Sequence, residues 1–258
     1  MSAKLAGQQV FIAYGQHRIV ENLDLNVPER RFTALIGPNG SGKSTILRTF
    51  AGLMAATEGT ILLDSHDIDT LSTKEMAKRV GVLLQGPVPP EGLTVRDLVQ
   101  QGRYPHRSLF GRWSKQDQDA CEEALMLTGM TTLAETALDT LSGGQRQRAW
   151  IAMTLAQQAE VLLLDEPTTY LDLAHQIELM NLITMLVHKH GKTVVAVLHD
   201  LNQAARYAEH VVMLKDGKIT AAGPPEDVIS AEAIADVFGV KSVIIRDPVA
   251  GTPLCVPL

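Results

Sequence analysis

The chain has 258 residues, a length that suits one large domain or two small ones. Hydrophobic residues make up 45% of it and charged residues 20%, which is ordinary for a globular protein with a sizeable core. The formal net charge of −6 argues against a broad basic face, so we expect no nucleic-acid partner.

The cysteines and the apolar runs argue against two further classes of protein. Cys121 and Cys255 stand far apart without a CxxC spacing, which predicts free thiols in a reducing compartment rather than a disulfide or a metal site. The first residues lack the apolar stretch of a secretory signal. No apolar run approaches the roughly 18–20 residues that span a bilayer. We therefore expect a cytoplasmic protein, unless a partner holds it at a membrane.

In chain order, the predicted elements begin with short β-type runs separated by turn residues. The first sixty or so residues predict three strands, then a helix that Gly52 ends, then a fourth strand. These five elements cover residues 8–14, 18–27, 32–37, 43–51 and 60–64.

The pattern changes at about residue 86, where strand-like runs disappear. Thr94 and Ser114 each stand three residues before an aspartate, as in an acidic variant of the capping box that starts a helix. We expect a helical insert over about 86–158, with its hinge in the Gly- and Pro-rich stretch 85–92.

Beyond this insert, strand-like and helix-like runs alternate, which implies βαβ units and a parallel sheet. An Asp216-Gly217 pair between two apolar runs indicates a β-hairpin. The alternating runs are a strand at 161–167, an amphipathic helix at 173–191, a strand at 193–200 and a helix at 201–209.

The stretch GPNGSGKS at 37–44 matches the phosphate-binding pattern G-x-x-x-x-G-K-[ST] between a strand and a helix. Glycine-loop N–H groups and the helix N-terminus are expected to cradle phosphates, with Lys43 on the β- and γ-phosphates and Ser44 on Mg²⁺. The alternative is a tight turn without a ligand. The predicted nucleotide-binding residues here are Gly37, Pro38, Asn39, Gly40, Ser41, Gly42, Lys43, Ser44 and Thr45.

The fold class expected from these patterns is α/β, with a P-loop NTPase core, a mixed sheet and an antiparallel β edge. We expect one domain over 1–258. Its nucleotide-binding core takes 1–85 and 159–258, and its helical subdomain takes about 86–158.

Two acidic residues follow the apolar run VLLL at the edge of the sheet where ligands bind. Asp165 is expected to hold Mg²⁺ through water. Glu166 is expected to point elsewhere, because strand side chains alternate, and to act as general base on the attacking water. The alternative is a pair of charges that only ends the strand.

Three more residues are candidates by position. His199 ends the next strand, where a neutral imidazole can bond the γ-phosphate and orient the water. Gln85 precedes the insert, where its amide can touch both Mg²⁺ and the γ-phosphate region. Tyr14 is either strand filler or a face for adenine to stack on. The histidines at 66, 106, 175, 188, 190 and 210 show no ligand spacing and are expected to be solvated helix-end residues.

The stretch LSGGQRQR at 141–148 places two glycines at the start of a predicted helix, where each costs roughly 1 kcal/mol. Together with the phosphate loop, Gln85, VLLLDEP and His199, in this order, it resembles the ATPase subunit of ATP-binding cassette transporters, of which LSGGQ is the signature. The stretches at 91–106, 141–157, 165–180 and 247–257 look like importer ATPases for ferric siderophores, close to those for haem and cobalamin.

The resemblance implies ATP and Mg²⁺ as cofactors and a role for each motif. Tyr14 would stack on adenine, and Gln85 would couple the nucleotide site to a membrane partner. Asp172 would lie in the segment that crosses a dimer interface. Tyr170 stands where many members carry a small residue. The signature residues that would contact the γ-phosphate bound to a second copy are Leu141, Ser142, Gly143, Gly144 and Gln145.

The same resemblance implies the partners of the chain and its location in the cell. They are a homodimer of ATPase subunits, two membrane permease subunits and an extracytoplasmic substrate-binding protein, at the cytoplasmic face of the inner membrane. The implied function is ATP-driven uptake of an iron(III)-siderophore complex. Haem, cobalamin or metal ions are alternative substrates. A soluble ATPase of DNA repair or translation, and a P-loop kinase or GTP switch, are the rival classes.

Overall fold

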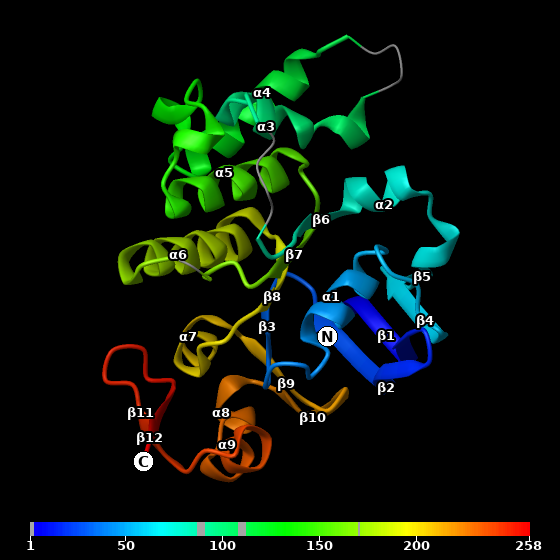
Figure 1. The fold of residues 1–258 in the computed structure, drawn as a ribbon, viewed down its shortest axis with the longest axis vertical. Helices are drawn as coiled ribbons and strands as arrows, with labels where there is room; N and C mark the ends of the chain where they lie inside the picture. The colour runs from blue at the N-terminus through cyan, green and yellow to red at the C-terminus, as the bar shows by residue number, and fades with distance from the viewer. Residues whose placement is uncertain (1–2, 87–90, 108–111, 170) are drawn as a thin grey trace.

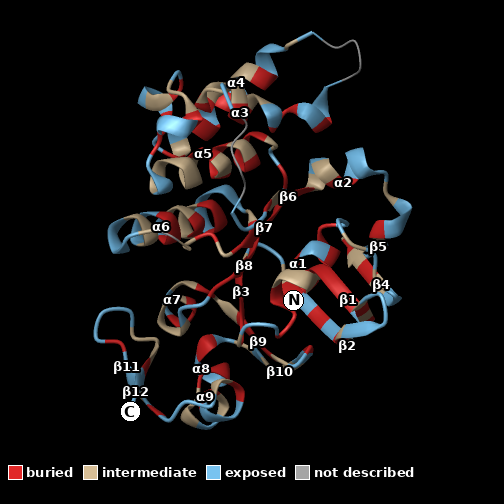
Figure 2. Ribbon diagram, in the orientation of Figure 1, coloured by how far each residue is buried: buried red, intermediate tan, exposed pale blue. Residues whose placement is uncertain are grey.

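A six-stranded sheet forms the centre of the computed structural model, which describes residues 3–86, 91–107, 112–169 and 171–258 (Figure 1). The strand order is β10-β9-β3-β8-β7-β6, parallel except for β10. Every residue of β3, β7 and β8 is buried, as in strands covered by helices on both faces (Figure 2). The strands are β3 (Phe32–Ile36), β6 (Val80–Leu83), β7 (Val161–Asp165), β8 (Thr193–Val197), β9 (His210–Lys215) and β10 (Lys218–Gly223).

A second, antiparallel sheet of order β2-β1-β4-β5 flanks the first. Helix α1 (Lys43–Phe50) joins the two, because its buried Ile46, Leu47 and Phe50 belong to a core that takes residues from both sheets. The mixed sheet and its antiparallel edge confirm the predicted fold class. The strands of this edge are β1 (Ala3–Tyr14), β2 (His17–Pro28), β4 (Glu58–Leu63) and β5 (His66–Asp67).

Helices α3, α4 and α5 gather beyond the β6 edge of the central sheet, with α6 below them in the view (Figure 1). Within the described residues of the predicted insert, 91–107 and 112–158, the structure has helices and turns and one isolated bridge, Thr94 to Ala137. Both predicted capping boxes are present, at Thr94 and at Ser114. The helices are α3 (Val95–Gln101), α4 (Lys115–Leu127), α5 (Gly143–Ala156) and α6 (Leu173–His190). Of the predicted hinge, residues 87–90 lie outside the described residues.

Several elements carry no sequence prediction. Helix α2 (Thr73–Arg79) buries only Met76, so it lacks an apolar stripe, and β6 is four residues long and contains Gly81. The predicted hairpin is confirmed, with Asp216 and Gly217 both at positive φ. The remaining elements are α7 (Leu201–Tyr207), α8 (Pro225–Val228), α9 (Ala231–Phe238) and the hairpin of β11 (Ser242–Arg246) and β12 (Pro253–Pro257).

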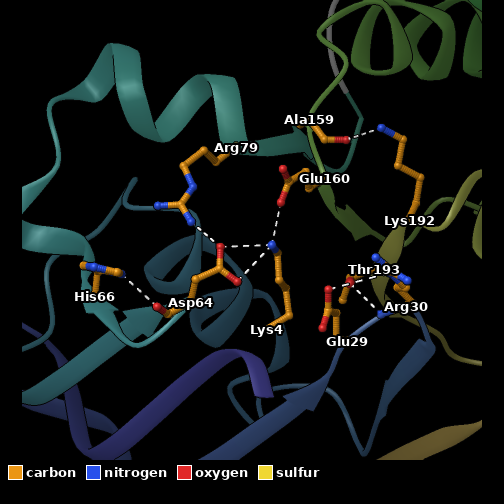
Figure 3. A network of polar contacts seen from close by, with 10 residues as sticks. All are labelled: Lys4, Glu29, Arg30, Asp64, His66, Arg79, Ala159, Glu160, Lys192 and Thr193. Carbon is orange, nitrogen blue, oxygen red and sulfur yellow. Dashed lines mark hydrogen bonds and ion pairs between the residues drawn. The ribbon is translucent and has the colours of Figure 1, made fainter. Parts of the chain in front are cut away.

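A network of charges around the buried Lys4 fastens the edge sheet to the central one (Figure 3). Lys4 of β1 is 8% exposed, and its Nζ donates to Asp64 at 2.9 Å and to Glu160 at 2.5 Å. Burial would lower the pKa of Lys4, but these carboxylates raise it above 10.5. Arg79 also pairs with Asp64. The network therefore fixes β1 to the N-terminal ends of β6 and β7, whose opposite ends lead to the acidic residues and to Gln85.

A buried ion pair holds the helical part together. Arg103 is 1% exposed and donates to Asp117 at 2.9 Å, to the Ala156 carbonyl at 2.7 Å and to Gln158 at 3.0 Å. Burial would raise the pKa of Asp117, but hydrogen bonds from Ser114 and Arg103 outweigh it and lower the pKa from 3.8 to about 2. The pair thereby joins the start of α4 to the ends of α3 and α5.

Asp117→Asn is expected to lower the free energy of unfolding by about 3 kcal/mol at pH 7, because it leaves the Arg103 charge buried without its partner. The folded-state pKa lies below the unfolded value, so the ionic contribution is present above pH 3.8 and is lost as pH falls toward 2. Urea unfolding at several pH values should show the difference in unfolding free energy between the parent and Asp117→Asn shrinking as pH falls from 3.8 to about 2. Asp119→Asn, an exposed change on the same helix, serves as control. A difference in unfolding free energy that stays constant down to pH 2 would contradict the ionic role of Asp117.

Both cysteines are free and buried, which confirms that they form no disulfide. Burial raises the pKa of the Cys121 thiol to about 11, so this thiol is unreactive at neutral pH. Within the described ranges, no helix has the length and hydropathy that a bilayer crossing needs.

Candidate nucleotide-binding site

The loop between β3 and α1 takes a conformation that needs glycine. Gly37 has φ 151°, and a Cβ there would lie 2.2 Å from the Leu214 carbonyl oxygen. Gly42 has φ 96° and precedes α1 without any side-chain cap, so the first-turn N–H groups of the helix are left for an anion. The predicted strand, loop and helix are therefore present, and their free N–H groups fit a bound phosphate.

Lys43 lies under this loop, 5% exposed. Its Nζ donates to the carbonyls of Gly37 and Pro38, both at 2.8 Å. Burial lowers the pKa of Lys43, although the nearby carboxylates of Asp165 and Glu166 act the other way. The ammonium is thus held beside the cradle by neutral carbonyls that a phosphate oxygen can outcompete.

Asp165 ends β7 beside the start of α1. Its Oδ1 accepts a hydrogen bond from Ser44 at 2.7 Å, across 121 residues of sequence. Asp165 is 1% exposed, burial raises its pKa, and its Oδ2 has no hydrogen-bond partner. A buried carboxylate oxygen without a partner, next to a hydroxyl, is the donor set that Mg²⁺ prefers, so these residues fit the metal.

Glu166 turns out of the strand for a reason other than the predicted one. The strand ends at Asp165, and Glu166 takes a left-handed backbone at φ 51°, a cost that non-glycine residues bear mainly at functional sites. The expectation that strand alternation orients it is therefore wrong. Its Oε1 lies 2.6 Å from His199 Nε2, and its Oε2 accepts from Gln85 Nε2 at 2.5 Å and from Thr169 Oγ1 at 3.1 Å.

These side chains border one cavity of about 550 Å³. Two of its residues were missed by the sequence analysis. Thr169 carried a weak signal, a hydroxyl three residues after Glu166. Ile19 carried none, since only the fold brings this residue of β2 within 3.6 Å of a Cβ placed on Gly42. The cavity is lined by Ile19, Asn39, Gly40, Gly42, Lys43, Ser44, Thr45, Gln85, Glu166, Thr169 and His199.

Several predicted residues do not line this cavity. Tyr14 is 51% exposed at the β1–β2 turn. Ser142 begins α5 and forms a capping box with Gln145, so the signature serine has a local partner that the sequence analysis did not foresee. Asp172 caps α6. Tyr170 lies outside the described residues.

The six histidines expected at helix ends are distributed over several kinds of element. His175, His188 and His190 belong to the first and last turns of α6, as expected. The helix-end expectation is wrong for His66 and His210, which start β5 and β9. Burial lowers the pKa of His210, with Arg31 acting in the same direction. In the part of the chain that the structure describes, no three metal-ligating side chains come together.

Comparison with known proteins gives a consistent result. Residues 20–169 match the model of the ABC transporter family. The chain is 52% identical over 256 residues to the ferric enterobactin transport ATP-binding protein FepC of Escherichia coli (strain K12), covering 99% of this chain and 94% of that protein. It is 50% identical over 257 residues to the probable siderophore transport system ATP-binding protein YusV of Bacillus subtilis (strain 168), covering 100% and 93%.

A solved structure with the same fold is the dimeric bacterial ABC transporter cassette MJ0796, with a TM-score of 0.76 and 31% identity over 85% of this chain and 98% of that one. That cassette has also been solved in a post-hydrolysis state with ADP and phosphate, at a TM-score of 0.74 and 30% identity over the same shares. With the phosphate cradle, the acidic pair and the signature helix all in place, the chain belongs to the ABC transporter family as an ATP-hydrolysing subunit.

Proposed function

We propose that this chain powers the import of an iron(III)-siderophore complex, as a homodimer bound to two permease subunits at the cytoplasmic face of the membrane. An extracytoplasmic binding protein delivers the complex. The observation that carries the substrate class is the 52% identity over nearly the whole of both chains to a ferric enterobactin transport subunit. Haem, cobalamin or a metal ion remain the alternative substrates.

The loop and Lys43 bind the triphosphate of ATP. Lys43 exchanges its two carbonyl partners, Gly37 and Pro38, for phosphate oxygens, which gives charge-assisted hydrogen bonds in place of neutral ones. Ser44, Gln85 and Asp165 would hold Mg²⁺, and the free Oδ2 of Asp165 supports this. When bound, the ion would neutralise part of the negative charge of the phosphates.

Glu166 acts as the general base. Gln85 and His199 each hold one of its carboxylate oxygens, at 2.5 and 2.6 Å, so the group is oriented before substrate arrives. It accepts the proton of the attacking water. His199 lines the same cavity, which supports a contact from its imidazole to the γ-phosphate.

The signature motif serves a second copy of the chain. It does not border the cavity of its own chain, while Ser142 and the start of α5 face outward with Gly143 and Gly144 exposed or half-exposed. A helix N-terminus with glycines can approach a phosphate closely. Two copies in head-to-tail contact would therefore close two ATP sites, and hydrolysis would open them.

A second cavity, of about 330 Å³, suits the permease. It is lined mainly by apolar residues between the end of α1, helix α2 and strand β6, including Leu53, which is 58% exposed, Met76 and Val82. β6 leads to Gln85 within two residues of its end. A permease segment seated here is placed to sense the nucleotide site, and the helical subdomain over about 86–158 would move with it.

The experiment is transport by the reconstituted complex. The chain is co-purified with its permease and placed in liposomes with ATP inside. The liposomes are then supplied with binding protein and with one of three labelled substrates: an iron(III)-siderophore complex, haem or cobalamin. We expect ATP-dependent uptake of the siderophore complex and none with Lys43→Ala. Uptake of only haem or cobalamin would reassign the substrate. ATPase activity stimulated by DNA or ribosomes instead would overturn the transport role.

A further inference from the structure

The signature turn rests on a histidine of its own chain. His175 lies in the first turn of α6, and its ring packs against the backbone of Gly144, where a Cβ would lie 3.1 Å from a ring carbon. A side chain at 144 would therefore meet this ring, which would have to shift by a few tenths of an ångström to make room for a Cβ. The histidine ring, in turn, restricts a backbone that two adjacent glycines leave mobile.

The same histidine is fixed to the segment after Glu166. Asp172 Oδ1 accepts from the backbone N–H of His175 at 2.9 Å and lies 2.7 Å from its Nδ1. With Nδ1 protonated, one carboxylate oxygen thus holds both the helix start and the ring. The His175 side chain is 33% exposed, so it is partly covered where it meets Asp172 and Gly144.

Two further contacts join α5 to the residues before and after His175. Gln147 of α5 donates from Nε2 to the Pro167 carbonyl at 3.0 Å, and Pro167 directly follows Glu166. Arg148 Nη1 lies 3.2 Å from Glu178 Oε2, one turn farther along both helices. The signature helix is therefore attached to residues 167–178 at three points, of which His175 is the one nearest the signature glycines.

We propose that His175 is a positioning residue that fixes the signature turn to the Asp172 segment. The γ-phosphate contacts offered to the second copy then move together with Glu166, which acts on the ATP of its own chain. The inference rests on the proposed use of the signature motif by a second copy. It adds a residue outside both motifs that couples one ATP site to the other.

The variants separate this role from helix capping. His175→Ala removes the ring and the Nδ1 donor but keeps the backbone N–H that Asp172 caps. His175→Asn returns a side-chain donor at about the place of Nδ1. His188→Ala is the matched control, because His188 is on the same helix and lies 3.1 Å from the Glu209 carboxylate, away from the signature turn.

The test has three measurements. ATP affinity of the monomer is measured by titration, and steady-state ATPase activity is measured with Glu166 intact. ATP-driven dimerisation is measured by analytical ultracentrifugation in a Glu166→Gln background. For His175→Ala we expect unchanged ATP affinity, a dimer Kd raised about tenfold and a similar fall in kcat, within the usual size of coupling between sites. His175→Asn should recover most of both, and His188→Ala should match the parent chain.

Unchanged dimerisation and kcat in His175→Ala would overturn the proposal. Equal losses of ATP affinity, folding stability and dimerisation in His175→Ala would also overturn it, because they would mark a residue that only supports the fold. A His175→Asn variant that recovers neither dimerisation nor kcat would overturn it for the same reason. If the Glu166→Gln parent itself does not dimerise with ATP, the proposed use of the signature by a second copy fails instead, so the two failures are distinguishable.

Discussion

Replacing Glu166 with Gln is expected to lower the kcat of ATP hydrolysis by about 10²–10⁴, the usual contribution of a general base. The amide keeps the size of the side chain and can still contact Gln85 and His199, so ATP binding should survive. Since hydrolysis is what opens the dimer, the variant should accumulate as an ATP-bound dimer. Phosphate release measures the rate, and ultracentrifugation with ATP measures the dimer.

Glu160→Gln is the matched control for this change. Glu160 stands just before the other end of β7 and pairs with Lys4, so its loss changes a charge near the same strand without touching the cavity. We expect the control to hydrolyse ATP at nearly the parent rate. Normal phosphate release by Glu166→Gln would remove the general-base assignment, whatever the control does.

Lys43→Ala is expected to weaken ATP binding by roughly 10- to 100-fold, because a charge-assisted hydrogen bond contributes about 1.5–3 kcal/mol. The loss should be larger for ATP than for AMP, which lacks the β- and γ-phosphates that Lys43 is placed to reach. Titration with a fluorescent ATP analogue, in competition with each nucleotide, measures both affinities.

The chain offers a half-buried lysine as a control. Lys192 donates to the Ala159 carbonyl at 2.6 Å, and burial lowers its pKa as it does that of Lys43, but it lies outside the nucleotide cavity. Lys192→Ala should keep ATP affinity. An equal loss of affinity in both variants would show that lysine burial supports the fold rather than the phosphate site.

Local patterns predicted their own structures well. The phosphate loop, the capping boxes at Thr94 and Ser114 and the Asp216-Gly217 hairpin are as expected, because each depends on the backbone of a few neighbouring residues. The short α2 and β6 were missed because α2 buries only Met76 and β6 is only four residues long, so neither shows a period.

The candidate site was only partly predictable. The sequence named Gln85, Glu166 and His199 one by one, but their mutual contacts depend on the order of β6, β7 and β8 in the sheet. The turn of Glu166 was given the wrong cause, since alternation applies only while the strand continues. The capping box of the signature was not predicted, although Ser142 and Gln145 have the spacing of one.

By itself, then, the sequence determined the phosphate loop, the acidic pair and the family, because these are fixed by the identity and spacing of adjacent residues. Tertiary structure alone decided that Ser44 meets Asp165 across 121 residues, that Gln85 meets Glu166 across 81, and that His175 packs on Gly144. Such contacts follow from strand order and helix packing, which summed burial over the whole chain selects and no local pattern encodes.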